Sequence, residues 1–133
     1  MTRTLAAVVT LATLGALAGT IEAQVKPSRG ATKDPRILAY DKGKDTINVS
    51  KYPPEMKAAY KVFENRCGAC HTLARAINSD YVLEDEWQGY IRQMIDKSGG
   101  LIEADEAARI FEFLMHDSKT RKKDLYEKKK AAS

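Results

Sequence analysis

The chain has 133 residues, of which 44% are hydrophobic and 30% charged, and its formal net charge at pH 7 is +4. This length is typical of one domain and excludes a large multidomain architecture. One domain of this size buries only a modest core, so apolar surface supplied by a bound group would add substantially to its stability.

Residues 1–23 have the pattern of a secretory signal peptide. Arg3 precedes an apolar stretch over residues 5–21, and residues 21–23 resemble a cleavage site before Gln24. Removing residues 1–23 takes away one Arg and one Glu, whose charges cancel, so the net charge stays +4. We therefore expect an exported, periplasmic protein. A retained membrane anchor is the alternative, although Thr and Gly residues interrupt the apolar stretch.

Residues 24–54 are predicted to form an irregular N-terminal extension, because Pro and Gly residues interrupt any helical or alternating period. Its expected contacts with the domain are Ile37, Leu38, Tyr40, Ile47 and Val49. A helix is then predicted over residues 55–66, with Met56, Ala59, Tyr60 and Phe63 on its apolar face.

This helix leads directly into Cys67-Gly68-Ala69-Cys70-His71, the CxxCH pattern of covalent haem attachment. Two thiols at this spacing can each add to a vinyl group of one porphyrin, and the adjacent histidine then lies under the iron. The motif contains both cysteines and one of the two histidines of the chain. It predicts one haem c, and with it redox chemistry at iron.

Three other interpretations of the motif fit the sequence less well. A disulfide at this spacing closes a very short ring and stabilises little. A thioredoxin-like dithiol normally follows a strand in a βαβ pattern, which this sequence lacks. A zinc site would need Cys67, Cys70, His71 and His116 together, and the adjacent Cys70 and His71 fit a tetrahedron poorly.

Past the motif, residues 72–80 show little periodicity and are expected to wrap part of the porphyrin. A second helix is predicted over residues 84–97, ending at Gly99-Gly100, and a third from about Ala104. Their apolar faces are Trp87, Tyr90, Ile91, Met94 and Ile95 in the second helix, and Ala107, Ile110, Phe111 and Leu114 in the third. No strand is predicted, so the domain over residues 55–118 should be all-α.

Residues 119–133 form a basic C-terminal tail, which is expected to extend the last helix into solvent. A basic surface that steers an acidic redox partner is the alternative interpretation. The tail has no interleaved aromatic pattern typical of nucleic-acid binding, so we expect no nucleic-acid partner.

Over residues 47–116 the chain resembles the small monohaem cytochromes c of class I. The resemblance rests on an aromatic helix leading into CxxCH, on the helix from Trp87 to Met94, and on a C-terminal helix containing Ile110 and Leu114. It implies three to four helices around one covalently bound haem. One departure is the absence of the usual Gly-Pro segment, whose carbonyl orients the haem histidine, so the partner that orients His71 is unassigned.

The candidates for the second axial ligand are Met56, Met94, Met115 and His116. Met56 precedes the motif by about 16 Å of helix, His116 lies opposite the apolar stripe of its helix, and Met115 lies at its flank. The family pattern places the ligand methionine after the tryptophan of the middle helix, which favours Met94. The predicted haem-binding residues are therefore Cys67, Cys70, His71 and Met94, with His71 and Met94 on the iron. Candidate partners of the haem propionates are Arg75, Tyr81, Trp87 and Arg92.

His/Met ligation closes the iron to substrate and favours iron(II). The sequence therefore predicts a one-electron carrier without enzymatic activity. Its expected partners are redox proteins: a dehydrogenase, an oxidase or a reaction-centre component, with a membrane-associated complex among the options. One alternative is a haem enzyme or gas sensor with an open or labile sixth position. Another is a non-haem interaction module in which the motif is coincidental.

Overall fold

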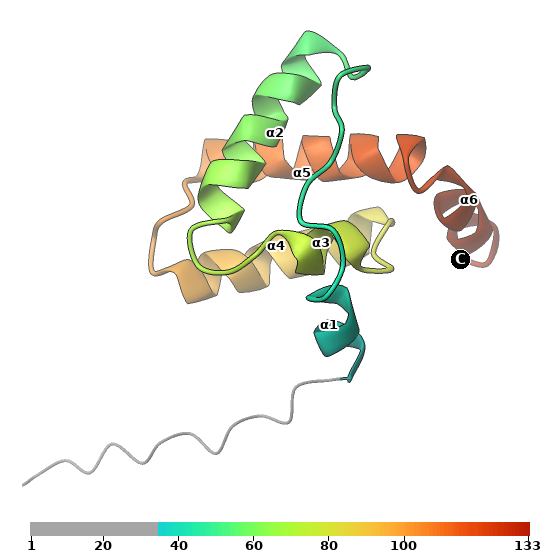
Figure 1. Cartoon of the computed structure of the whole chain (residues 1–133), viewed down its shortest axis with the longest axis horizontal. Coiled ribbons are helices and arrows are strands. Elements are labelled where there is room, and N and C mark those ends of the chain that lie inside the picture. Colours follow the sequence, from blue (N-terminus) through green and yellow to red (C-terminus); the bar gives the residue numbers. More distant parts are fainter. Residues whose placement is uncertain (1–34) are drawn as a thin grey trace, which may run out of the picture. The chain divides into compact units, whose positions relative to one another are not determined.

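The computed structural model describes residues 35–133, which form six helices and, within this range, no strand (Figure 1). The helices are α1 (Pro35–Tyr40), α2 (Pro54–Cys67), α3 (Ala74–Asn78), α4 (Glu84–Ser98), α5 (Ala104–Thr120) and α6 (Lys123–Ala131). The predicted all-α class is confirmed for this part of the chain. The signal peptide predicted over residues 1–23, and residues 24–34 of the extension, lie outside the described residues.

The centre of the core is the crossing of α2 and α5 (Figure 1). Phe63 of α2 and Phe113 of α5 are both completely buried, and their ring centroids are 5.4 Å apart. Tyr60 lies one turn before Phe63 and packs on Phe113 at 5.1 Å. Tilted aromatic contacts of this kind add to the stability gained from burial. They fix the C-terminal end of α2, where the CxxCH motif begins.

Helix α4 packs on α5 through Trp87, which is 1% exposed. The backbone N–H groups of Val82 and Leu83, at the start of α4, both donate to the Glu86 carboxylate at 2.9 Å. The helix ends at Gly99, whose φ of 61° is in the left-handed region that favours glycine. This turn lets the chain reverse into α5, as the Gly99-Gly100 pair predicted.

The segment before α2 lies against the domain, as expected. Ile47 is buried and its backbone N–H donates to the Tyr60 hydroxyl at 3.2 Å, while Val49 is half-buried against the same core. The expected contacts of Ile47 and Val49 are thus confirmed. Residues 35–40 were expected to be irregular but form α1. Tyr40 is half-buried there, and the side chains of Ile37 and Leu38 lie outside the described part.

The apolar face expected for the third helix is confirmed, since Ile110 and Leu114 are buried and Ala107 and Phe111 pack partly buried against the core. Phe113, which the prediction left out, is completely buried as well, because it faces α2. The expected extension of this helix by the tail was wrong. The tail does not continue α5, which ends at Thr120 and is followed by the separate helix α6. None of the helices within residues 35–133 is both long and apolar enough to cross a membrane.

Candidate functional site

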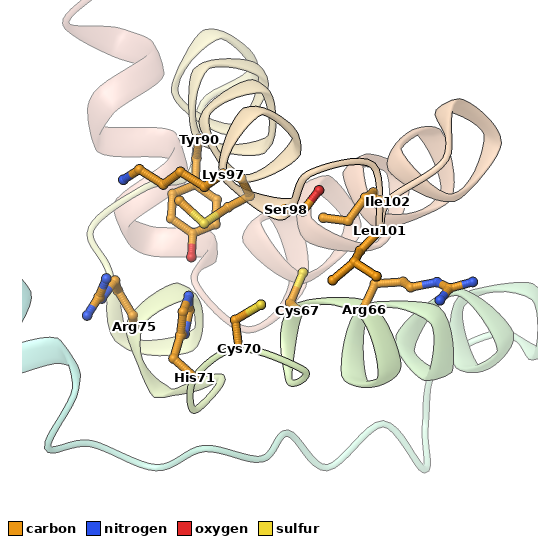
Figure 2. Close-up of a pocket in the computed structure, with 11 residues that line it drawn as sticks. Arg66, Cys67, Cys70, His71, Arg75, Tyr90, Lys97, Ser98, Leu101 and Ile102 are labelled. Carbon is orange, nitrogen blue, oxygen red and sulfur yellow. The ribbon is translucent and has the colours of Figure 1, made fainter. Parts of the chain in front are cut away.

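The four predicted site residues all line one pocket, which lies between the C-terminal end of α2, the turn after it, and α4. Its empty volume is about 680 Å³, part of which is open to solvent. The wall is completed by Arg66, Arg75, Tyr90, Lys97, Ser98, Leu101 and Ile102 (Figure 2). The enclosed part of the cavity is about 190 Å³, smaller than the ~300–1,000 Å³ of sites that enclose a whole ligand, so a bound cofactor would also occupy the part open to solvent.

Cys67 and Cys70 present their sulfur atoms on the same side of the turn, toward this pocket (Figure 2). Cys67 is the last residue of α2, and the turn at residues 68–70 brings Cys70 beside it. Both thiols are free. The turn needs glycine at position 68, because a Cβ there would lie 2.4 Å from the Glu64 carbonyl oxygen. The backbone therefore places two free thiols at one edge of the pocket.

His71 has an orienting partner that the sequence left unassigned. Its Nδ1 lies 2.8 Å from the carbonyl oxygen of Thr72. A carbonyl oxygen only accepts hydrogen bonds, so this contact selects the tautomer of the neutral imidazole that has its proton on Nδ1 and a free electron pair on Nε2. This is the arrangement in which a histidine binds a metal through Nε2 while its other nitrogen is held in place. No sequence motif indicates this hydrogen bond, because the acceptor is the backbone carbonyl of the next residue.

Of the four candidates for a second ligand, the structure brings Met94 alone to this pocket. Met56, Met115 and His116 line a different pocket together, on the side of the domain formed by α2 and α5. His116 was expected to face solvent but is half-buried, with its ring centroid 4.7 Å from that of Tyr52. Met94 is half-buried and lies against the core as well as at the pocket. A thioether and an imidazole thus share one cavity.

Tyr90 is a site residue that sequence reasoning placed only in the core. Its phenol extends from α4 into the pocket (Figure 2), where burial, followed by the nearby Cys67 thiol, raises its pKa. The hydroxyl therefore stays protonated over the physiological range and can donate a hydrogen bond. The available signal was its position four residues before Met94, on the same helix face, with a polar atom at the end of an apolar ring.

The structure brings one of the four predicted propionate partners, Arg75, to the pocket. Its guanidinium also forms two hydrogen bonds with Asp41, at 2.9 and 2.7 Å. Trp87 is not available, because its indole N–H donates to Ser118 in the core. Tyr81 packs on Trp87 and Tyr90, and Arg92 is exposed near Phe111. The expectation is therefore wrong for Trp87 and has no support from the positions of Tyr81 and Arg92.

The site chemistry argues against two of the three competing interpretations of the cysteines. Burial, reinforced by the neighbouring Cys70, raises the pKa of the Cys67 thiol to about 12. A redox-active dithiol needs a lowered thiol pKa instead. A zinc site would need His116 beside the motif, but His116 lines a different pocket.

Comparison of the chain with protein-family models, with curated proteins and with solved structures finds no match. Function therefore has to be argued from the pocket itself. Its donor set fits covalently held haem: two thiols at one edge, an imidazole with a free Nε2, a thioether, and apolar walls from Tyr90, Leu101 and Ile102.

Proposed function

We propose that this protein is an exported, monohaem cytochrome c with a class I-like fold, which transfers single electrons between redox proteins. The observation that carries the proposal is that Met94 and the CxxCH residues line the same pocket, while the other candidate ligands line another. The apolar stretch at residues 5–21 supports export, since it has the pattern of a signal peptide.

In this proposal each site residue has one task. Cys67 and Cys70 hold the cofactor through thioether bonds, and His71 offers Nε2 to the iron while Thr72 keeps its ring in place. Met94 offers its thioether sulfur from α4. When bound, haem iron supplies one-electron oxidation and reduction, and a His/Met ligand pair raises its reduction potential.

The walls of the pocket are suited to a flat apolar group. Ile102 is buried, and Leu101 is a large hydrophobic side chain that is 53% exposed at the pocket. A haem in contact with Leu101 would remove this apolar surface from water, a favourable change. Arg75 and Tyr90 supply hydrogen-bond donors at the same pocket, suitable for the carboxylates of the cofactor.

The first experiment tests whether haem is present and whether the iron is closed. The protein is produced in a periplasm that attaches haem c and is assayed as the pyridine haemochrome, followed by carbon monoxide addition to the reduced form. We expect one covalent haem that binds carbon monoxide slowly. Rapid binding would indicate an open or labile position, as in a haem enzyme or gas sensor. Absence of haem would refute the proposal.

The second experiment tests the ligand. Met94→Ala should abolish the long-wavelength sulfur-to-iron band of the oxidised protein. It should also lower the potential by on the order of 0.1 V, within the ~0.8 V that axial ligands control. Met115→Ala is the matched control, because Met115 is also half-buried but lies at the other pocket. Loss of the band in Met115→Ala but not in Met94→Ala would overturn the assignment.

A further inference from the structure

Three cationic side chains from the C-terminal end of the chain bind the backbone at the end of α3 and in the segment that joins α3 to α4. Arg121 donates to the carbonyl of Ile77 at 3.0 Å, Lys122 to those of Ser79 at 2.8 Å and Tyr81 at 3.4 Å, and Lys129 to that of Asp80 at 2.7 Å. We call Arg121, Lys122 and Lys129 the carbonyl clamp. These carbonyls lie at the end of α3 and in the connection after it, so the clamp gives them partners.

Lys129 also holds the start of α4. Its ammonium forms an ion pair with Glu86 at 2.5 Å. The other oxygen of Glu86 accepts the N–H groups of Val82 and Leu83, which precede the helix. The residues of this ion pair are only about a quarter exposed, so solvent screens it less than a pair on the open surface. One lysine of α6 therefore binds both the connecting segment and the helix that carries Met94.

The clamped segment is also in contact with the wall of the pocket. The ring of Tyr81 packs on Tyr90, with centroids 5.8 Å apart, and Tyr90 lines the pocket four residues before Met94. In sequence, the same segment joins the part of the chain that contains His71 to the helix that contains Met94. The position of this segment therefore affects how His71 and Met94 face each other.

We propose that Lys129, with Arg121 and Lys122, positions α4 so that Met94 stays at the pocket, which makes α6 a control element of the sixth ligand. This inference rests on the proposed function for its effect on the iron, but the clamp itself can be tested without the cofactor. Lys129 is a positioning residue, since it touches the connecting segment and α4 but does not line the pocket. A clamp that loosens should let external ligands displace Met94 more readily.

The test compares three variants of the full chain. Lys129→Gln removes the charge, Lys129→Arg keeps it, and Lys128→Gln removes the charge of an exposed lysine next to it in α6. Amide hydrogen exchange is measured for residues 79–83 and 90–94 whether or not haem is present, and imidazole binding is measured on the oxidised haem protein. Circular dichroism and exchange in α2 and α5 check that each variant is folded.

In Lys129→Gln we expect exchange at residues 79–83 and 90–94, and the rate of imidazole binding, to rise about fivefold or more. Amide exchange and imidazole binding in Lys128→Gln should match those of the parent. Lys129→Arg should keep most of the protection that Lys129→Gln loses. Equal exchange in Lys129→Gln and Lys128→Gln would refute the clamp. Faster exchange with unchanged imidazole binding would refute its control of Met94. Absence of covalent haem after expression under haem-attaching conditions would refute the proposed function, while the exchange experiment would still decide the clamp.

Discussion

The indole N–H of Trp87 donates to the Ser118 hydroxyl at 2.9 Å, which joins α4 to α5 by a polar contact inside the core. Both residues are almost completely buried, at 1% and 0% exposure. The Ser118 hydroxyl donates in turn to the Leu114 carbonyl at 2.8 Å. Because each group has a partner, this contact fixes one position of α4 on α5, and α4 is the helix that presents Met94 and Tyr90 to the pocket.

Ser118→Ala should lower the free energy of unfolding by about 1–3 kcal/mol, because it leaves the buried indole N–H of Trp87 without an acceptor. Urea unfolding followed by tryptophan fluorescence and circular dichroism measures the change. Thr120→Ala is the control, since Thr120 is an exposed residue at the end of the same helix. Equal stability of Ser118→Ala and Thr120→Ala would show that the contact contributes nothing.

The contribution of Lys122 to stability should rise with pH between about 8 and 10, opposite in sign to that of a free Cys67 thiol, whose raised pKa makes its contribution fall with pH. The Lys122 ammonium donates to two carbonyls, but burial, followed by the nearby Arg121 charge, outweighs these contacts and lowers its pKa to about 8 from 10.5. In this window the unfolded chain binds more protons at Lys122 than the folded one, so this contribution favours folding as the pH is raised. The rise should be of the order of 2 kcal/mol.

Unfolding measured across this window in the parent and in Lys122→Gln checks the assignment. The glutamine keeps a donor for the carbonyls without a charge, and all other titrating groups are the same, so the difference in unfolding free energy between parent and variant should change in favour of the parent as the pH rises through this window. Above pH 10 both proteins should lose stability. Burial raises the pKa values of Tyr52 and Tyr90 in the folded state, so the unfolded chain then releases protons more readily. A parallel rise in Lys122→Gln would mean that another group is responsible.

Changing Cys67 and Cys70 to alanine together should strongly destabilise the protein. If the protein holds haem as proposed, the pocket would lose its covalent cofactor and leave apolar side chains such as Leu101 in contact with water. Thermal unfolding of the variant, compared with the parent expressed under the same haem-attaching conditions, gives the measurement. If the double variant unfolds cooperatively at the temperature of the parent, the fold does not depend on the cofactor.

Helix positions were largely predictable because their signals are local. The helix predicted over residues 55–66 is observed as Pro54–Cys67, and the one predicted over residues 84–97 as Glu84–Ser98. Prolines at the start of the first and glycines at the end of the second mark these limits. Helix α3 was not predicted because it has only five residues, too few to show a period. Its side chain Asn78 is held by acceptors far along the chain, including the carbonyls of Tyr40 and Lys44.

The site was predictable to the extent that its residues lie close together in sequence or share one helix face. The CxxCH residues are consecutive, and Met94 follows from the apolar face of its helix together with the family pattern. The positions of the other site residues depend on how the helices pack. Whether a buried aromatic such as Tyr90 lines the pocket, or Trp87 bonds to the core, depends on how α4 lies on α5. The carbonyl clamp depends on the end of α5 at Thr120 and the start of a separate helix after it. The run of basic residues in this part of the sequence does not indicate that the helix ends there.

The hydrogen bond from His71 to the carbonyl of Thr72 has a consequence for the order of assembly. The thiols, the imidazole and the group that orients it all come from six consecutive residues, 67–72, so this half of the site needs no distant part of the chain to form. In the proposed cytochrome, attachment of the cofactor would therefore not depend on prior folding. Met94 lies at the pocket only when α4 has packed on α5. Binding of Met94 to the iron would therefore indicate that folding is complete.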